Sequence, residues 1–360
     1  MTEVHEGLEG VVAFRTRIAE PDREGGALRY RGVDIEELAG HVPFEQVWGL
    51  LVDDALEPGL PRAEAYLARG LTGDAPADLQ AATAALGGEW RLGKLIDITD
   101  AEATADLRRL SATMIAVVAQ SARVADGHVE PVDRATIDSG RSTAERFLLE
   151  WRGEADPEHV GAIETYWICT AEHGLNASTF TARVVASTGA DCAASLSSAV
   201  GALSGPLHGG APARVLPMLD AVADLGDADA WVKAALDRHE RIMGFGHRVY
   251  RAEDPRSRLL RRKAKELGSP RFEVAEALEE AALAELQARR PDRVLATNVE
   301  FWSAVVLDAA DVPPALAPAM FACSRTAGWS AHILEQKQLG RLVRPSAEYV
   351  GPGPRSLSEL

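Results

Sequence analysis

The sequence predicts an all-α protein with many helices and a small β-hairpin near its N-terminus. Apolar residues repeat at three- and four-residue steps in nearly every segment between residues 34 and 339, which is the pattern of helices with one buried face. Strands do not alternate with helices, so a parallel sheet is not expected. Aromatic residues make up 6% of the chain while Ala, Leu and Val are abundant, which favours helices packed through small side chains.

The first 40 residues differ from the rest of the chain. Residues 11–14 and 27–32 are short extended segments on either side of the turn-rich stretch 21–26, which together predict a hairpin. Asp34 then stands where an acidic side chain can accept hydrogen bonds from the first backbone N–H groups of a helix.

Helices are expected along most of the remaining chain. In the N-terminal half they are predicted at residues 44–51, 63–71, 77–86, 101–122 and 133–151. Three more follow at 162–172, 178–187 and 191–203, the last of them rich in Ala and Ser. Charged helices between 227 and 288 lead to an apolar helix at 303–307 and a long one at 317–339, closed by Gly340 and followed by an extended tail from Leu342.

Length and charge bound the function. A chain of 360 residues buries a large core and is expected to divide into two lobes, the more polar block forming the second. A net charge of -16 argues against general binding to nucleic acid or membrane surfaces, and no apolar run reaches the length of a membrane span.

The cysteines and the first residues indicate the compartment. Cys169, Cys192 and Cys323 lie far apart in apolar helical patterns without zinc-ligand spacing. We therefore expect reduced core residues of a cytoplasmic protein, and the acidic, polar start has no features of a signal peptide.

One stretch of the chain concentrates unusual residues. Gly244 and Gly246 flank Phe245, so the backbone can approach a ligand closely, and His247 follows at once. Between residues 238 and 265 there are ten Lys or Arg against three acids, in an otherwise acidic protein. This basic island indicates a bound polyanion of modest size; the alternative is a solvated helix face with an incidental histidine.

Three histidines lie beside glycines. They are His173 before Gly174, His208 within residues 205–210, and His247. A metal site is conceivable, but none of the three has the short spacing typical of metal ligands. Without metal they suit carbon-acid chemistry, which needs a carboxylate base, a donor to the enolate oxygen and an acid for the electrophile. No role is assigned to the histidines in polar or helix-surface contexts: His5, His41, His128, His159, His239 and His332.

Three strings of residues carry a family resemblance. Residues 172–178 (EHGLNAS), 205–210 (GPLHGG) and 244–250 (GFGHRVY), the last followed by Asp254-Pro255-Arg256, resemble the citrate synthase family. The likeness runs from Leu28 to Pro345, and its motifs are specific because they are long and occur in the right order.

The resemblance implies roles for individual residues. His208 would donate a hydrogen bond to the thioester carbonyl of acetyl-CoA, kept neutral with help from a nearby helix N-terminus. His247 would protonate the carbonyl oxygen of oxaloacetate, and His173 would contact the same oxo-acid. Three arginines would bind its carboxylates in bidentate fashion: Arg256, Arg325 and Arg344.

The resemblance also implies partners and an architecture. Arg344 would reach into the site of a partner subunit, which predicts a homodimer. Gly244, Phe245, Gly246 and Arg251 match the CoA-binding loop, and no metal or redox cofactor is expected. The large domain would comprise residues 1–209 plus 311–360 and the small domain 210–310, with a cleft between them that closes over oxaloacetate.

Position 300 departs from the family. The catalytic base of the citrate synthase family is an aspartate in an Asn-Val-Asp context, whereas this chain has Asn298-Val299-Glu300. The extra methylene moves the carboxylate by roughly an ångström, a displacement that can cost about a hundredfold in rate. Either the backbone accommodates Glu300 as a competent base, which we favour, or the protein is a slow or altered paralogue. A purely structural glutamate is a weaker interpretation because unpaired buried carboxylates are costly.

The predicted reaction is the condensation of acetyl-CoA with oxaloacetate, followed by hydrolysis of citryl-CoA to citrate and CoA. The first alternative is the same fold using propionyl-CoA to make 2-methylcitrate, because one methylene in an apolar pocket is worth only about 1–3 kcal/mol. The second is a ligand-binding protein that has lost turnover through the change at Glu300.

Overall fold

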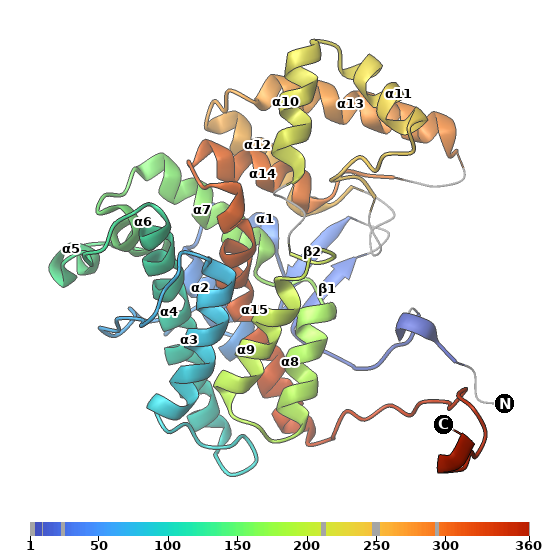
Figure 1. The fold of residues 1–360 in the computed structure, drawn as a ribbon. Coiled ribbons are helices and arrows are strands. Elements are labelled where there is room, and N and C mark those ends of the chain that lie inside the picture. Colours follow the sequence, from blue (N-terminus) through green and yellow to red (C-terminus); the bar gives the residue numbers. More distant parts are fainter. Residues whose placement is uncertain are drawn as a thin grey trace.

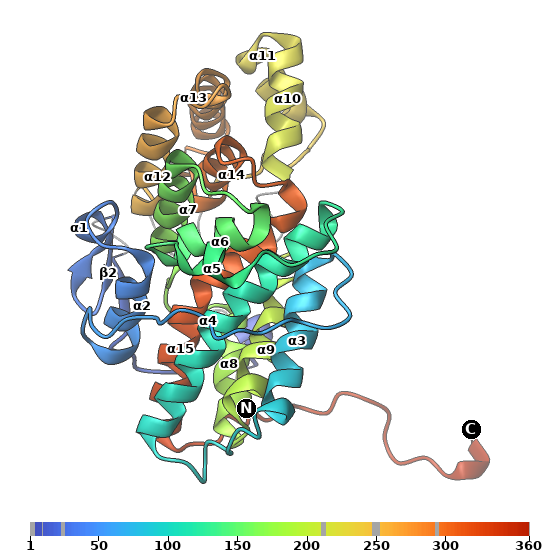
Figure 2. The same ribbon diagram turned by 90° about the vertical axis from the view of Figure 1, so that its left-hand side faces the viewer.

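The computed structural model describes residues 4–8, 10–22, 26–209, 214–246, 253–291 and 295–359. It confirms the all-α prediction: the described residues form helices labelled α1 to α15 and one small sheet of three strands at the side of the molecule (Figures 1 and 2).

The sheet lies near the N-terminus. Strand β1 (Ala19–Asp22) pairs antiparallel with β2 (Ala27–Tyr30), and β2 pairs with β3 (Val33–Asp34). The predicted hairpin is therefore right in its second strand and wrong in its first, because residues 11–14 form no strand. Ile18, next to β1, is fully buried whereas Val12 is 88% exposed, so the pairing follows the residues that reach the core.

Side-chain caps fix where most helices begin. The Asp34 side chain accepts the N–H of Glu36 at α1 (Ile35–Leu38), as predicted. Thr99 and Glu102 form a reciprocal capping box at α4 (Asp100–Ala125). Asp, Asn or Ser caps also open α3 (Ala75–Glu89), α5 (Arg134–Asp138), α6 (Thr143–Arg152), α7 (Pro157–Thr170), α8 (Ala177–Ser187), α9 (Cys192–Leu203), α11 (Ala228–Asp237), α12 (Pro255–Glu266) and α14 (Val299–Ala309).

Two of the predicted helices are wrong. Residues 63–71 form no helix, and side chains of other elements bond their backbone: Gln120 accepts the N–H of Ala68 and donates to the carbonyl of Tyr66. The predicted helix 133–151 is two helices, α5 and α6. Gly140 lies at the break, where a Cβ atom would stand 2.7 Å from the Cγ of Arg146.

The core is built around α15 (Ala317–Leu339), which the sequence predicts with the same bounds and which Gly340 closes in the left-handed conformation. This helix packs against α2 (Phe44–Asp53), α4, α7, α8 and α9 and runs through the middle of the molecule (Figures 1 and 2). The three cysteines are buried and free, which confirms their assignment to the core.

A second group of helices gathers at one end of the molecule, at the top of both views (Figures 1 and 2). It contains α10 (Val215–Leu225), α11, α12, α13 (Phe272–Arg289) and α14, of which α12 and α14 also pack on α7. The exact division into domains 1–209 plus 311–360 and 210–310 stays a prediction.

The chain ends differ from the compact body. Residues 341–356 form an extended, largely exposed tail that leaves the other helices (Figure 1). Among the described residues, no helix has both the length and the apolar character needed to cross a membrane.

Candidate active site

The predicted site residues gather where α7, α12, α14 and α15 meet. Helix α12 contacts α7 and α14, and α7 in turn contacts α14 and α15. Four of the predicted residues lie on or beside these helices: His173 in the turn after α7, Arg256 on α12, Glu300 on α14 and Arg325 on α15.

The predicted CoA-binding segment pairs with the chain just before α14. The N–H of Gly246 donates to the carbonyl of Ala296 at 2.8 Å, and the N–H of Asn298 donates to the carbonyl of Gly244 at 2.8 Å. Phe245 forms an antiparallel bridge with Thr297. This pairing brings two segments that lie some fifty residues apart in sequence to the start of the helix that carries Glu300.

The two glycines are required by this geometry. Gly244 has φ +89° and Gly246 has φ +90°, which is the left-handed region that side chains rarely adopt. A Cβ atom on Gly244 would also stand 2.7 Å from the Cβ of Phe301 on α14. A side chain at position 244 would prevent the segment from approaching α14 this closely, so glycine is required there.

Glu300 lies in the first turn of α14. That helix begins at Val299, four residues earlier than predicted, because the Asn298 side chain accepts the N–H of Glu300 at 3.0 Å and caps it. Burial raises the pKa of Glu300, which Arg241 and Arg256 partly offset and Asp254 reinforces. A carboxylate with a raised pKa is a stronger base than one in water.

Asp254 joins the starts of α12 and α14. Its carboxylate caps α12 and holds Arg256 in a fork, with Nε 2.9 Å from Oδ1 and Nη2 2.7 Å from Oδ2. Oδ2 also accepts the N–H of Val299 at 3.2 Å. Both side chains of this ion pair are buried. Sequence reasoning named Asp254 only within the string 254–256 and gave it no site role, although its place two residues before Arg256 was the available signal.

His208 is half-buried beyond the end of α9. Its Nε2 lies 2.9 Å from the Oγ of Ser178, and its ring meets Phe321 edge-on. Burial lowers the pKa of His208 to about 4, and the nearby charge of Arg325 adds to the effect. The imidazole is therefore neutral near pH 7, as expected.

Ser178 is a site residue that sequence reasoning missed. Besides facing His208, its hydroxyl donates to the Oδ1 of Asn176 at 2.9 Å and accepts from the Nε1 of Trp329 at 3.2 Å. Both Asn176 and Ser178 belong to the string 172–178, so the resemblance marked the segment without showing which side chain touches His208.

Arg325 is 1% exposed on α15. Its Nε donates to the carbonyl of Thr170 at 2.9 Å, and its guanidinium lies over the ring of Phe321. Burial lowers the pKa of Arg325, and the carboxylate of Glu172 raises it. His332, which the sequence placed among histidines in polar or helix-surface contexts, is instead 1% exposed and bonded to Glu172, so that expectation was wrong.

Electrostatic interactions connect these groups. The charge of Arg256 lowers the pKa of both Glu300 and Arg325, and the charge of Arg325 lowers the pKa of His208. A basic carboxylate, a neutral imidazole and buried arginines together suit removal of a proton from carbon next to a carbonyl, with anionic groups of a second reactant held by the arginines.

Among the described residues, Arg344 is not brought into this cluster. Arg344 is exposed in the C-terminal tail. His247 and Arg251 lie outside the described residues. Within the described ranges no three His, Cys, Asp or Glu side chains are grouped to hold a metal ion.

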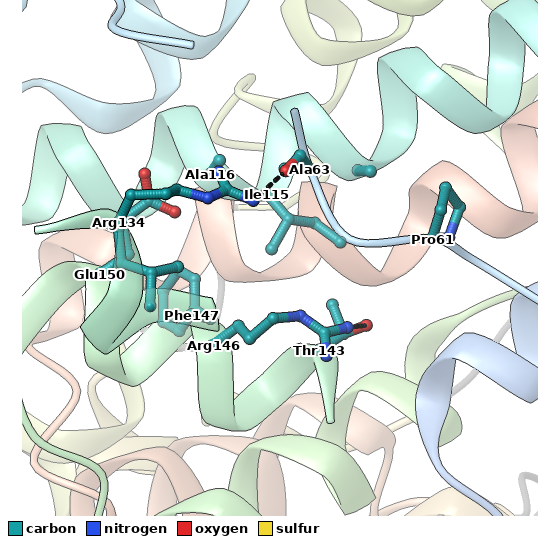
Figure 3. A pocket seen from close by; sticks show the side chains of 11 residues that line it. Pro61, Ala63, Ile115, Ala116, Arg134, Thr143, Arg146, Phe147 and Glu150 are labelled. Atoms are coloured by element: carbon teal, nitrogen blue, oxygen red, sulfur yellow. Dashed lines mark hydrogen bonds between the residues drawn. The ribbon is translucent and has the colours of Figure 1, made fainter. Parts of the chain in front are cut away.

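A separate small cavity lies between the segment that precedes α3 and helices α4 and α6 (Figure 3). It measures about 30 Å³, and Arg134 and Arg146 line it together with the half-buried Glu150. Arg134 donates to the carbonyl of Ala63 there. No predicted site residue lines this cavity, so it is distinct from the cluster described above.

Comparisons with known proteins agree on one family. The family model described as citrate synthase, C-terminal domain, matches residues 7–346. A Mycobacterium tuberculosis protein that carries the name citrate synthase 2 is 61% identical over 352 residues, which are 97% of this chain and 94% of that protein. A 2-methylcitrate synthase of Shewanella oneidensis is 32% identical over 98% of this chain and 96% of its own.

A solved structure gives the same result. The citrate synthase of Thermoplasma acidophilum, in a ternary complex with carboxymethyl coenzyme A and oxaloacetate, superposes with a TM-score of 0.85. It shares 27% sequence identity, and the match covers 100% of both chains.

Proposed function

This chain belongs to the citrate synthase family of acyltransferases, and we propose that it condenses acetyl-CoA with oxaloacetate and hydrolyses the resulting citryl-CoA to citrate and CoA. The observation that carries the proposal is Glu300: a carboxylate with a pKa raised by burial, in the first turn of α14, beside the predicted CoA-binding segment.

The first step is proton transfer from carbon. Glu300 takes a proton from the methyl group of the acetyl thioester, and the electrons move to the thioester oxygen. His208, neutral near pH 7, donates a hydrogen bond from Nδ1 to that oxygen and stabilises the enolate, while the Ser178 hydroxyl turns from Asn176 to donate to Nε2 of His208. A protonated imidazole is not needed here, because a neutral donor is a closer match to the acidity of an enol.

Condensation and hydrolysis follow. The enol carbon attacks the keto carbon of oxaloacetate, a carbon–carbon bond forms, and His247 donates a proton to the oxygen that becomes the hydroxyl group. Water then attacks the thioester of citryl-CoA, releasing citrate and the CoA thiol. Atoms balance without any metal or redox cofactor, and we propose that none is required.

The arginines suit a dicarboxylate. Arg256 and Arg325 are buried in the same cluster, and Asp254 fixes the orientation of the Arg256 guanidinium. His173, in the turn after α7, is proposed to contact the keto-acid. Gly244, Phe245, Gly246 and Arg251 are proposed to bind the CoA moiety. The Thermoplasma acidophilum protein, which binds oxaloacetate and a CoA analogue, supports this choice of substrates.

Arg344 is proposed to act in trans. Its exposed tail leads away from the helices of its own chain (Figure 2). We propose that two chains form a homodimer in which each Arg344 completes the partner's oxo-acid site, and that the enzyme works in the cytoplasm.

A second candidate is 2-methylcitrate synthase, favoured by the Shewanella oneidensis relative. The two reactions differ by one methyl group on the acyl-CoA. Selectivity of about tenfold to a few hundredfold is what an apolar pocket provides for such a difference.

Release of CoA thiol from acetyl-CoA or propionyl-CoA, with and without oxaloacetate, tests the proposal. We expect thiol release that depends on oxaloacetate and a higher kcat/KM for acetyl-CoA. A higher kcat/KM for propionyl-CoA would establish the second candidate. No thiol with either substrate, from a protein that still binds oxaloacetate, would contradict both and leave the impaired paralogue.

A further inference from the structure

A chain of buried polar side chains runs from α8 to the predicted oxo-acid site. Arg183 on α8, His332 on α15 and Glu172 in the turn after α7 are each at most 1% exposed. His332 lies between the other two. Its Nδ1 is 2.9 Å from Nη1 of Arg183, and its Nε2 is 3.1 Å from Oε1 of Glu172. We call these three residues the buried relay.

The partners of His332 determine its tautomer. A guanidinium can only donate hydrogen bonds, so Nδ1 of His332 must accept and carries no proton. The remaining proton is on Nε2, which donates to the carboxylate of Glu172. Arg183 therefore fixes the ring of His332, and the ring in turn fixes the carboxylate of Glu172. The imidazole is neutral in this arrangement.

The outer end of the relay is anchored by other residues. Arg183 donates through Nη1 to Glu335 at 2.6 Å and through Nε to Gln336 at 3.0 Å. The Glu335 side chain is 22% exposed, so charge compensation for Arg183 comes from near the surface. The arginine is thus held independently of Glu172.

The inner end lies against two predicted substrate ligands. Glu172 directly precedes His173, and the backbone N–H of His173 donates a hydrogen bond to the carboxylate of Glu172. The charge of Glu172 also raises the pKa of Arg325. Burial raises the pKa of Glu172, whereas the hydrogen bond from His332, the charge of Arg325 and the N–H of His173 lower it.

Helix α15 is shaped to admit this carboxylate. A Cβ atom on Gly328 would stand 2.0 Å from Oε2 of Glu172 and 2.7 Å from the carbonyl of Ala171. An apolar core of the same shape would avoid the cost of burying charges. The relay instead places a charged acceptor between His173 and Arg325, where an anionic substrate would be held.

We propose that Glu172 is a positioning residue of the oxo-acid site, and that His332 acts through it. The carboxylate orients the turn that carries His173 and the guanidinium of Arg325 before the oxo-acid binds. This inference rests on the proposed function, because it takes oxaloacetate as the anion that His173 and Arg325 receive.

The test compares three substitutions by steady-state kinetics. His332→Leu removes both hydrogen bonds, and we expect it to raise KM for oxaloacetate by about tenfold or more while KM for the acyl-CoA changes less than about twofold. His332→Gln can accept from Arg183 and donate to Glu172, so it should restore KM to within about threefold of wild type. Glu64→Gln, the same kind of change at an exposed carboxylate that pairs with Arg109, should leave both KM values unchanged.

Glu172→Gln provides a second measurement if His332→Leu does not fold. It retains an acceptor for His332 but removes the charge, and we expect KM for oxaloacetate to rise about fivefold or more. A KM that is unchanged or lower would overturn the proposal. Equal loss of thermal stability in the Leu and Gln variants at position 332, with wild-type KM values, would show a purely structural role and overturn it as well.

Calorimetric titration with oxaloacetate separates the two levels of inference. If the wild-type protein binds no oxaloacetate, the proposed function fails and this inference with it. If wild type binds and His332→Leu binds equally well, only the role of the relay is refuted. Weaker binding by His332→Leu, restored in His332→Gln, is the expected result.

Discussion

At the scale of single residues, Glu300 is the proposed base. Glu300→Gln should lower kcat by about 10²–10⁴-fold, the usual contribution of a general base, with the fold intact. Glu300→Asp should retain or raise activity, because aspartate is the family's base at this position. Thiol release by purified variants measures both.

Substantial activity in Glu300→Gln would mean that another base operates. Asp308 is near in sequence, but it is paired with Arg271 at 2.8 Å, which makes it a poor substitute. His332→Gln is a suitable control for handling and purity, since it is expected to stay close to wild type.

The lowered pKa of His208 predicts a dependence of stability on pH. The unfolded chain protonates this imidazole near pH 6.5, whereas the folded protein does so only near pH 4. The unfolded state therefore binds more protons between these values, and stability falls as the pH drops from 6.5 to 4. At pH 5 the loss from this group is about 2 kcal/mol.

Urea unfolding of wild type and His208→Gln at pH 7 and pH 5 checks this prediction. The variant should lose about 2 kcal/mol less than wild type between the two pH values. The same loss in both proteins would mean that His208 is not the titrating group. Turnover of His208→Gln should be strongly reduced at either pH.

Sequence reasoning marked segments that hold proposed site residues, but it did not show the contacts that these residues make across the fold. Glu172 and His208 stand in two of the quoted strings, and Glu300 stands in the segment 298–300, yet no string indicates a partner for Glu172. Glu172 and His332 lie 160 positions apart, and only the packing of α15 against α7 brings them together. No local pattern could indicate a contact of that range.

At the scale of elements, Asp254 connects two helices. Asp254→Asn should destabilise the protein by about 3–5 kcal/mol, because Arg256 would lose its buried carboxylate partner and α12 part of its cap. Asp227→Asn is a matched control: Asp227 caps α11 through the N–H of Ala230 from an exposed position, so its loss should cost about 1 kcal/mol or less.

Chemical denaturation of the two variants decides between a linking role and simple capping. Equal destabilisation by Asp254→Asn and Asp227→Asn would contradict the linking role of Asp254.

Gly244→Ala should displace the predicted CoA-binding segment. The new Cβ atom would meet Phe301, and the left-handed backbone adds strain of roughly 1 kcal/mol. We expect KM for the acyl-CoA to rise by about tenfold or more. Gly226→Ala is the control, because φ there is also positive (+70°) but no atom lies within 4 Å of the added group.

Kinetics of both glycine variants against acyl-CoA concentration provide the measurement. A similar KM in the two variants would indicate that backbone strain, and not the contact with Phe301, sets the effect.

The helices themselves were predicted well wherever a cap and a periodic apolar face coincide, as at α8, α9 and α15. Residues 63–71 have the periodicity but form no helix, because Gln120 and Arg134 bond their backbone, and the local sequence does not reveal these contacts. Helix α14 was placed too late because Asn298 was not recognised as its cap.

At the scale of the whole molecule, the tail predicts complementation between subunits. Arg344→Ala and His208→Ala should each be nearly inactive alone. In a mixed dimer, one site receives His208 from one chain and Arg344 from the other and is complete. Random mixing should therefore restore about a quarter of wild-type activity.

Subunit exchange of the two purified variants, followed by the thiol assay, tests this. Activity that stays at the level of the separate variants would show that Arg344 does not act in trans. Light scattering on the same samples checks that dimers are present.

The fold class and the family could be predicted from the sequence because long helices and three specific strings determine them. The domain boundaries and the preferred acyl-CoA could not, since both depend on how distant surfaces meet. The family match covers nearly the whole chain, and it still leaves the effect of Glu at position 300 to experiment.

The hydrogen bonds of Asp254 and Asn298 have a mechanical consequence. Asp254 fastens α12 to α14, and Asn298 fastens α14 to residues 244–246. These bonds join Glu300, Arg256 and residues 244–246 into one unit. His208 and Arg325 lie outside the α10–α14 group, so closure of the proposed cleft would carry the proposed base and the proposed CoA segment toward them together.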